Sequence, residues 1–286
     1  MAAKIIDGKA VAAKVRNACR HRVETLVTLG TQPGLAVIIV GDNPASKVYV
    51  ANKVKACAEV GVKSKVNAYP ADAAEADVLH LIERLNADPA IHGILVQLPL
   101  PPNYNVRRLL ETISKDKDVD GFHLYNVGAL AVGSSIFPPC TPYGVSKILE
   151  HEEIHVSGQN VVVVGASNIV GKPMALMLMQ KDATVAICHA MTRDLAQFTI
   201  LADILVVAAG RPNLILPQMV KTGAVVIDVG INRLPSGELV GDVDFAGVRQ
   251  KASHITPVPG GVGPMTVTML IENTVQSAER FVGLAA

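Results

Sequence analysis

Short runs of mostly apolar residues recur along this chain of 286 residues and constrain its fold more than any other feature. Two of them, Leu35–Val40 and Ile91–Leu98, lack regular alternation, which is typical of strands buried in a parallel sheet. Helical periodicity appears over residues 9–29 and 73–86, and a further strand is predicted over residues 65–69. Alternating strands and helices favour βαβ units, so we predict an α/β protein with parallel sheets.

The second half of the chain repeats this alternation and adds a glycine turn after its first strand. Val161–Val164 is followed by Gly165, which permits a tight turn, and by Ser167, which with the next helix N-terminus offers donors to a phosphate. The strict G-x-G-x-x-G pattern is not met, because Ser167 replaces the second glycine. Further strands are predicted over residues 183–188, 203–209 and 224–229, a Rossmann-like succession.

The end of the second strand in this half bears on the choice of dinucleotide. An NAD site typically has Asp or Glu there to bind the ribose hydroxyls. Here residues 188–193 read Cys-His-Ala-Met-Thr-Arg, and the first acid is Asp194. The missing acid, with His189 and Arg193 nearby, favours NADP over NAD. His189 is also compatible with a strand end that binds no ligand.

Composition argues against several other classes of function. Lys and Arg number 26 against 25 Asp and Glu, a net charge of +1, which gives no electrostatic case for a nucleic-acid or membrane partner. The four cysteines contain no Cys-x-x-Cys pair, so neither a disulfide framework nor a metal site is expected. No signal core or membrane-spanning run is present, and we expect a cytoplasmic enzyme.

Several polar side chains stand where ligands bind in open α/β sheets, beyond the carboxyl end of a strand. Tyr49 and Lys53 are one turn apart on the helix predicted after Leu35–Val40, with Ser46 as its N-cap. They flank a predicted core face of Val50, Val54, Cys57 and Ala58. Spacing alone favours a snorkelling lysine beside a half-buried tyrosine over a catalytic pair. Gln97, at the end of a strand stopped by prolines, either caps loop amides or binds a ligand.

Three loops complete the set of candidates. Asp118-Val-Asp120-Gly121 lacks the full Ca²⁺-loop pattern, and its spacing favours a solvated turn over a ligand grip. Pro138–Gly144 is rich in proline and indicates a rigid domain boundary. The uncharged loop over residues 254–267 contains adjacent glycines, which let the backbone approach a ligand, and it precedes a helix that runs to about residue 282.

Together these motifs resemble one family, the bifunctional methylenetetrahydrofolate dehydrogenase/methenyltetrahydrofolate cyclohydrolases. The matching segments follow the family's order across essentially the whole chain: Gly41–Ser46 with Tyr49 and Lys53, Gln97–Pro101, Asp118–Gly121, Pro139–Pro142, Gly165–Pro173, Asp228–Asn232 and Pro257–Thr266. Each segment alone is a weak signal, and seven in order are a strong one.

The resemblance implies two α/β domains with folate in the cleft between them. Residues 1–139 with 268–286 would form the folate-binding catalytic domain, and residues 140–267 the Rossmann-like NADP-binding domain. The implied activity is NADP-dependent oxidation of methylenetetrahydrofolate to methenyltetrahydrofolate, followed by hydrolysis to 10-formyltetrahydrofolate. Family members are typically homodimers that join through their cofactor domains.

The resemblance also implies roles for individual residues. Lys53 would be the acid/base group of the hydrolysis, Gln97 would hold it, Tyr49 would orient the folate, and Asp120 would accept hydrogen bonds from the pterin. The implied substrate contacts are Tyr49, Lys53, Val96, Gln97, Leu98, Asp120, Pro259, Gly260, Gly261, Val262, Gly263, Pro264, Met265, Thr266 and Val267. The candidate cofactor contacts are Gly165, Ala166, Ser167, His189, Arg193 and Ile231.

One departure from the family's pattern concerns the cofactor. Many members have Arg at the position of Ala166, and some have it at that of Ala190, so here an NADP preference rests on Ser167, His189, Arg193 and the missing acid. Two rival functions stay open: another two-domain NADP-dependent dehydrogenase of the shikimate type, and a non-catalytic nucleotide-binding regulatory protein. The first rival does not explain why Tyr49, Lys53, Gln97 and Asp120 occur together, and the presence of Lys53 and Gln97 argues against the second.

Overall fold

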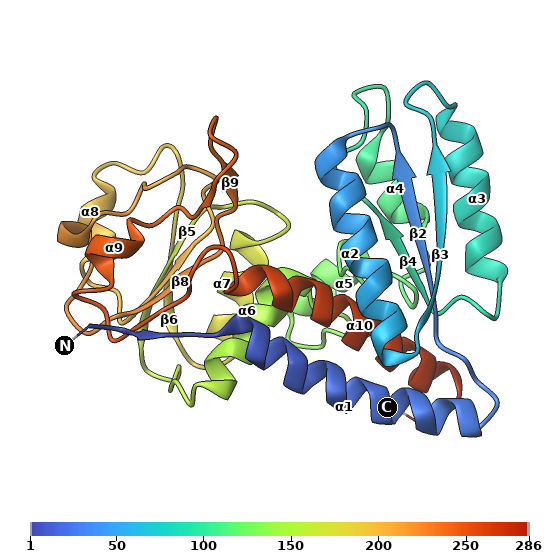
Figure 1. Ribbon diagram of the computed structural model, residues 1–286, viewed down its shortest axis with the longest axis horizontal. Helices are drawn as coiled ribbons and strands as arrows, with labels where there is room; N and C mark the ends of the chain where they lie inside the picture. The colour runs from blue at the N-terminus through green and yellow to red at the C-terminus, as the bar shows by residue number, and fades with distance from the viewer. Residues whose placement is uncertain (1, 285–286) are drawn as a thin grey trace. The chain divides into compact units, whose positions relative to one another are not determined.

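The computed structural model describes residues 2–284, and the chain divides into two compact units. The three-stranded unit comprises Ala13–Cys140 and Val267–Ala286, and the six-stranded unit comprises Met1–Ala12 and Thr141–Thr266. Figure 1 labels their elements. The sequence places the first twelve residues in the folate-binding domain. They belong instead to the six-stranded unit, because strand β1 (Lys4–Ile5) pairs with β11 (His254–Ile255).

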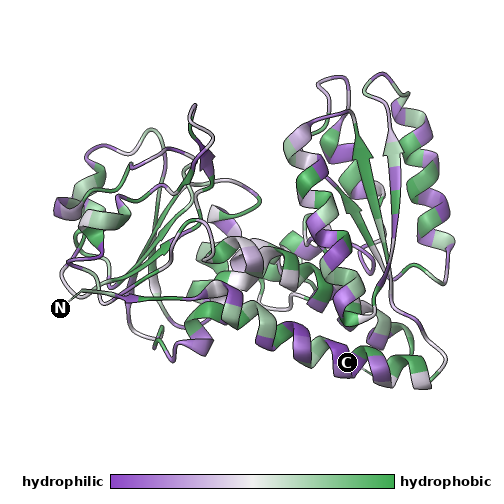
Figure 2. Cartoon of the chain, in the orientation of Figure 1, coloured by the Kyte–Doolittle hydropathy of each residue, from purple (hydrophilic) through white to green (hydrophobic). Residues whose placement is uncertain are grey.

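The three-stranded unit has a parallel sheet with the order β3-β2-β4, which confirms the predicted parallel pairing. The central strand β2 is buried along its whole length, and Figure 2 shows it in the hydrophobic colour. The elements are β2 (Gly34–Val40), α2 (Pro44–Val60), β3 (Lys63–Tyr69), α3 (Glu75–Ala87), β4 (Gly93–Val96), α4 (Val106–Thr112) and α5 (Leu124–Ala131).

Helix α2 begins earlier than its sequence suggests. The N-cap is Asn43, whose side chain accepts a hydrogen bond from the Ser46 backbone N–H, and Ser46 itself is buried inside the helix. Pro44 can occupy the first turn because its missing N–H has no intrahelical partner there. The core face also differs at one position: Val50 and Cys57 are buried as predicted, whereas Ala58 is exposed.

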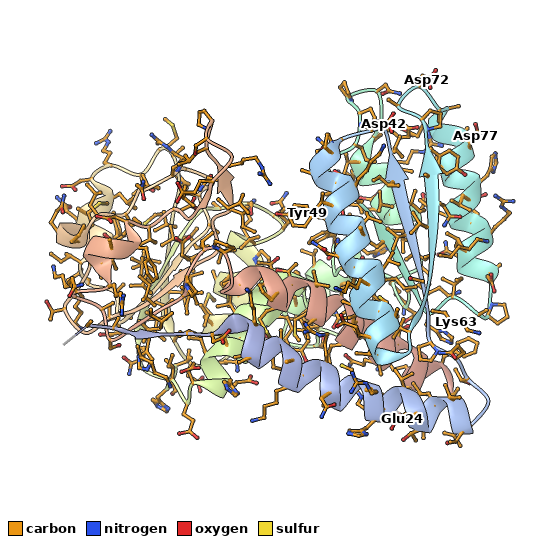
Figure 3. The ribbon with its side chains drawn as sticks, in the orientation of Figure 1. Glu24, Asp42, Tyr49, Lys63, Asp72 and Asp77 are labelled. Carbon is orange, nitrogen blue, oxygen red and sulfur yellow. The ribbon has the colours of Figure 1, made fainter. Side chains whose placement is uncertain are left out.

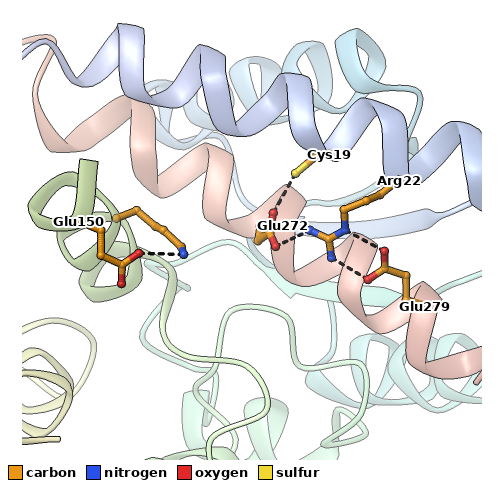
Figure 4. A network of polar contacts seen from close by, with 6 residues as sticks. Cys19, Arg22, Glu150, Glu272 and Glu279 are labelled. Carbon is orange, nitrogen blue, oxygen red and sulfur yellow. Dashed lines mark hydrogen bonds and ion pairs between the residues drawn. The ribbon is translucent and has the colours of Figure 1, made fainter. Parts of the chain in front are cut away.

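Two long helices, α1 (Gly8–Thr28) and α10 (Val262–Phe281), carry a partly buried ionic network (Figure 4). Arg22 donates to both oxygens of Glu279, at 2.8 and 2.7 Å, and to Glu272. The thiol of Cys19 donates to Glu272 at 3.0 Å. Burial raises the pKa of this thiol, with the Glu272 charge adding to the effect, so Cys19 stays protonated and acts as a donor.

The start of α10 corrects a second prediction. The sequence suggests a loop as far as Val267, but the helix begins at Val262. Pro264 therefore lies in the first turn of the helix, where proline is tolerated.

The six-stranded unit has a parallel sheet with the order β1-β11-β8-β7-β5-β6. Strand β6 lies on one side of β5 and β7 on the other, so the strand order reverses at β5, where ligands bind in open α/β sheets. A small antiparallel hairpin is not predicted by the sequence. The elements are α6 (Cys140–His151), β5 (Asn160–Val164), α7 (Gly171–Met179), β6 (Thr184–Cys188), α8 (Leu195–Thr199), β7 (Ile204–Val207), η1 (Pro217–Met219), β8 (Val225–Asp228), the hairpin β9 (Asn232–Arg233) and β10 (Leu239–Val240), and α9 (Phe245–Val248).

Across residues 2–284, the longest helices are too polar or too short to cross a bilayer.

Candidate active site

Lys53 and Gln97 come together at the carboxyl end of the three-stranded sheet. Gln97 follows the last residue of β4, and Lys53 projects from α2. The Lys53 Nζ donates to Gln97 Oε1 at 3.0 Å. The Gln97 amide nitrogen donates to the carbonyl of Leu98 at 2.7 Å, which turns its oxygen toward the lysine. Gln97 is thus fixed by its place at the end of β4 and by the Leu98 carbonyl, and it in turn holds the Lys53 amine in place.

Asp120 reaches the same end of the sheet through an irregular segment beside β4. The Ile94 N–H donates to the carbonyl of Lys117 at 2.8 Å, and Gly93 leaves room for Val119, whose methyl groups would lie 2.8–2.9 Å from a β-carbon there. This segment therefore runs along the open edge of β4. Burial raises the pKa of the Asp120 carboxyl, and the nearby positive charge of Lys53 opposes that rise.

Cys140 and Asn273 are two members of this cluster that sequence reasoning does not single out. The Cys140 thiol lies within hydrogen-bond range of the Asp120 carboxylate and 3.4 Å from the carbonyl of Val119. Burial raises the pKa of this thiol well above its usual value, so it remains a donor. The Asn273 amide donates to the carbonyls of Val119 and Pro138, at 2.8 and 3.0 Å, and fastens the two segments together.

Asp118 has a different role from Asp120. It is 1% exposed and accepts hydrogen bonds from the backbone of Phe122 and His123 and from the side chain of Asn126. A turn therefore forms here, as the acidic spacing favours, but the prediction that it is solvated is wrong for Asp118, which is buried. Asp120, the second acid of the motif, takes no part in these turn hydrogen bonds.

The other predicted substrate residues of the three-stranded unit differ in accessibility. Tyr49 is 41% exposed and extends from the outside of α2 (Figure 3). Leu98 is half-buried, whereas the side chain of Val96 belongs to the hydrophobic core with Ile38 and Val40. Val96 can therefore offer a ligand only its main chain.

The remaining predicted substrate residues, apart from Val267, lie in the six-stranded unit. Gly261 packs against the first residue of α1, because a β-carbon on Gly8 would lie 1.8 Å from the Gly261 carbonyl oxygen. Gly260 has a φ of +107°, which favours glycine. Met265 is fully buried, and Thr266 Oγ1 lies 3.0 Å from Thr141 Oγ1. Pro259 is exposed and Gly260, Gly263 and Pro264 are half-buried, whereas Gly261 and Val262 are buried.

The glycine turn after β5 has the close packing that a dinucleotide site requires. Gly165 has a φ of +120°, and a β-carbon there would lie 2.2 Å from the Ala208 carbonyl oxygen. A β-carbon on Gly171 would lie 1.8 Å from the Gly165 carbonyl oxygen, so α7 begins directly against the turn. The Gly165 N–H donates to the carbonyl of Cys188, which brings the ends of β5 and β6 together.

Side chains around this turn are arranged to donate hydrogen bonds. Ser167 Oγ accepts from the backbone of Val170 and Gly171, so its own proton is available to an anion. His189 Nδ1 accepts from the Met191 N–H, which leaves Nε2 as the donor. Arg193 is exposed and makes no ion pair with any side chain in the described part of the chain. These residues fit a phosphate-bearing dinucleotide.

Asp228, at the end of β8, is a buried carboxylate whose ionisation affects stability. Burial raises its pKa from 3.8 to about 7, and backbone hydrogen bonds from Asp242, Val243 and Gly230 limit the rise. Between these pH values the folded chain binds a proton that the unfolded chain has released. The contribution of Asp228 to stability is therefore highest at acid pH and falls as the pH rises toward 7.

This sign predicts a pH-dependent difference between the wild type and Asp228→Asn. The free energy of urea unfolding of the wild type, minus that of the variant, should fall by roughly 3 kcal/mol between about pH 5 and pH 8. A difference that stays constant over this range would show that Asp228 is ionised throughout.

The two units thus define an α/β enzyme that pairs a dinucleotide-binding sheet with a lysine, amide and carboxylate cluster. The chain belongs to the tetrahydrofolate dehydrogenase/cyclohydrolase family. The model of that family's catalytic domain matches residues 6–120, and the model of its NAD(P)-binding domain matches residues 139–282.

Individual relatives agree with this assignment over nearly their full length. The bifunctional protein FolD of Nitrosospira multiformis is 62% identical over 98% of this chain and 97% of its own. The crystal structure of the bifunctional FolD enzyme of Campylobacter jejuni is 53% identical, with a TM-score of 0.96, and covers 98% of this chain and 99% of its own. The Trypanosoma brucei enzyme, solved with NADP and an inhibitor, is 39% identical with a TM-score of 0.95 and 99% of each chain covered.

The shikimate-type rival has only a distant likeness. A shikimate dehydrogenase from Thermus thermophilus is 17% identical, with a TM-score of 0.51, and covers 86% of this chain and 99% of its own. At this identity the likeness extends to the fold alone.

Proposed function

We propose that the chain is a bifunctional one-carbon folate enzyme. It oxidises methylenetetrahydrofolate to methenyltetrahydrofolate with NADP⁺ and hydrolyses the product to 10-formyltetrahydrofolate. The three-stranded unit forms the folate-binding catalytic domain, and the six-stranded unit binds the dinucleotide. The observation that carries the proposal is the 3.0 Å hydrogen bond from Lys53 to Gln97, with Asp120 close enough for its pKa to respond to the lysine charge.

In the oxidation, NADP⁺ supplies the acceptor for the hydride that leaves the one-carbon bridge. The protein contributes position more than acid/base chemistry at this step. Asp120 accepts hydrogen bonds from the pterin, and Tyr49 orients the folate. Gly165, Ala166, Ser167 and Ile231 hold the dinucleotide, and the close packing at Gly165 supports this assignment.

In the hydrolysis, water adds to the methenyl carbon and loses a proton. The hydroxyl of the adduct then loses its proton and becomes the formyl oxygen, while the bond between this carbon and N5 breaks and N5 takes up a proton. Lys53 transfers these protons, and Gln97 fixes the amine so that it stays within reach of the reacting carbon. One proton is released overall.

The preference for NADP⁺ over NAD⁺ rests on the strand end after β6. Arg193 and His189 offer hydrogen-bond donors to a 2′-phosphate. Residues 188–193, which begin at the strand end, contain no carboxylate that could bind a 2′-hydroxyl. Replacing Arg193 with Ala should raise the KM for NADP⁺ roughly ten-fold, as expected for loss of one exposed phosphate contact, and leave the KM for NAD⁺ nearly unchanged. Initial rates with both cofactors measure this. A wild type that prefers NAD⁺ would overturn the cofactor assignment.

We also propose that two copies associate through the six-stranded unit, as a homodimer in the cytoplasm. Strand β6 is an edge strand, and apolar side chains remain exposed beside it on Ile187, Phe198, Ile200 and Leu201. Light scattering should give twice the chain mass for the wild type and a lower mass for Leu201→Glu; a monomeric wild type would refute the dimer.

All four cysteines are free and buried, which suits a reducing compartment such as the cytoplasm, and cell fractionation tests that location.

A further inference from the structure

Asp242 joins the two segments that follow the neighbouring strands β7 and β8 of the six-stranded sheet. Its side chain is completely buried. One carboxylate oxygen accepts from the N–H groups of Ala209 and Gly210, at 2.6 and 2.9 Å. The other accepts from the N–H of Arg211 at 2.9 Å and from the side-chain amide of Asn232 at 2.7 Å. A single carboxylate thus fixes the loop after β7 and the segment after β8.

Both of these segments contact parts of the dinucleotide site. The loop after β7 packs against the glycine turn, since a β-carbon on Gly165 would lie 2.2 Å from the carbonyl oxygen of Ala208. The segment after β8 contains Ile231, which is 45% exposed, and its Cδ1 lies 3.7 Å from where a β-carbon on Gly263 would stand. Asp242 therefore connects the phosphate-binding side of the site with the side that holds Ile231.

The surrounding chain is shaped to hold this carboxylate in one position. The Asp242 N–H donates to Asp228 Oδ1 at 3.0 Å, and the Val243 N–H donates to Asp228 Oδ2 at 3.0 Å. Two glycines leave space for the acids: a β-carbon on Gly230 would lie 2.3 Å from Asp242 Oδ1, and one on Gly241 would lie 1.8 Å from Asp228 Oδ2. Both carboxyl groups therefore lie directly against glycine backbone.

We propose that Asp242 is a positioning residue for dinucleotide binding, which holds both loops in the binding geometry before the cofactor arrives. The proposal deepens the proposed function and rests on it. When the loops are already ordered, binding does not have to offset the free energy of ordering them. Loss of this carboxylate should therefore weaken the affinity for the cofactor. Hydrolysis of methenyltetrahydrofolate requires no dinucleotide, so that activity should survive.

The test compares Asp242→Asn with Asp244→Asn, the same change two residues along the chain. The Asp244 side chain accepts from the Gly247 N–H, and within residues 2–284 it makes no hydrogen bond to the loop after β7 or the segment after β8, so it is a matched control. We expect Asp242→Asn to raise the dissociation constant for NADP⁺ at least ten-fold, with the hydrolysis rate within two-fold of wild type. Asn232→Ala removes the amide donor to Asp242 together with a longer bond, 3.4 Å, to the carbonyl of Val240. It should raise the dissociation constant by a smaller factor, and it keeps the test available if Asp242→Asn does not fold.

The possible results are distinguishable. An unchanged dissociation constant in Asp242→Asn, or in Asn232→Ala when only that variant folds, overturns the positioning role. Equal losses of cofactor binding and hydrolysis also overturn it, because they indicate a general structural role. A wild type that does not bind NADP⁺ would contradict the proposed function itself, which the wild-type titration measures separately.

Discussion

Replacing Lys53 with Ala should lower the rate of methenyltetrahydrofolate hydrolysis by roughly 10²–10⁴-fold, the usual effect of removing a positioned acid/base group. The Lys53 amine is held in the cluster by its hydrogen bond to Gln97 Oε1. Alanine at this position has no group that could transfer the protons. Binding of NADP⁺ should be unchanged, because the glycine turn lies in the other unit. The rate is followed as the loss of methenyl absorbance.

A suitable control is Lys55→Ala, on the same helix. Lys55 is exposed and lies two residues beyond Lys53, on another side of α2, so its loss should change neither activity. Wild-type hydrolysis in Lys53→Ala would refute the assigned role. A similar loss of hydrolysis in both variants would indicate that any substitution on α2 disturbs the site. It would then give no support to a role for Lys53 in the reaction.

Replacing Asp120 with Asn should reduce kcat/KM for folate substrates in both activities. The carboxylate is the proposed acceptor for the pterin, and an amide presents a donor in place of one of its two acceptor oxygens. Hydrogen bonds to a charged group contribute up to about 3 kcal/mol, which corresponds to a loss of roughly a hundred-fold. The effect on both reactions distinguishes this variant from Lys53→Ala, which should affect only hydrolysis.

Asp116→Asn is the matched control for this variant. Asp116 is exposed and paired with Lys115, so removing its charge should have no effect on either rate. Retention of normal kcat/KM for folate in Asp120→Asn would exclude the carboxylate from substrate binding.

Much of the fold follows from local patterns in the sequence. The apolar runs at Leu35–Val40 and Val161–Val164 become strands of parallel sheets because they can be buried on both faces. The glycine turn at Gly165 is equally readable, since its positive φ and the lack of room for a side chain require glycine. Boundaries are harder to predict: α2 begins at Pro44, and α10 begins two residues before Pro264.

The candidate site depends on contacts that no local pattern encodes. Spacing alone leaves Lys53 as a plausible snorkelling side chain, and its bond to Gln97 joins residues 44 positions apart. Asp118 and Asp120 are equivalent in sequence, yet the first holds a turn and the second faces the lysine. The contacts of Asp242 span 31–33 residues on one side and 10 on the other, so they emerge only from the folded sheet.

The central claim is that one chain performs both steps and that Lys53 is needed only for the second. The most direct measurement mixes wild type or Lys53→Ala with methylenetetrahydrofolate and NADP⁺ and follows methenyl absorbance together with NADPH formation. The rate of hydrolysis without protein is subtracted. We predict that both proteins form NADPH, that methenyl absorbance rises and then decays with the wild type, and that it accumulates with Lys53→Ala. Decay at the wild-type rate in the variant, or no NADPH from the wild type, would contradict this account.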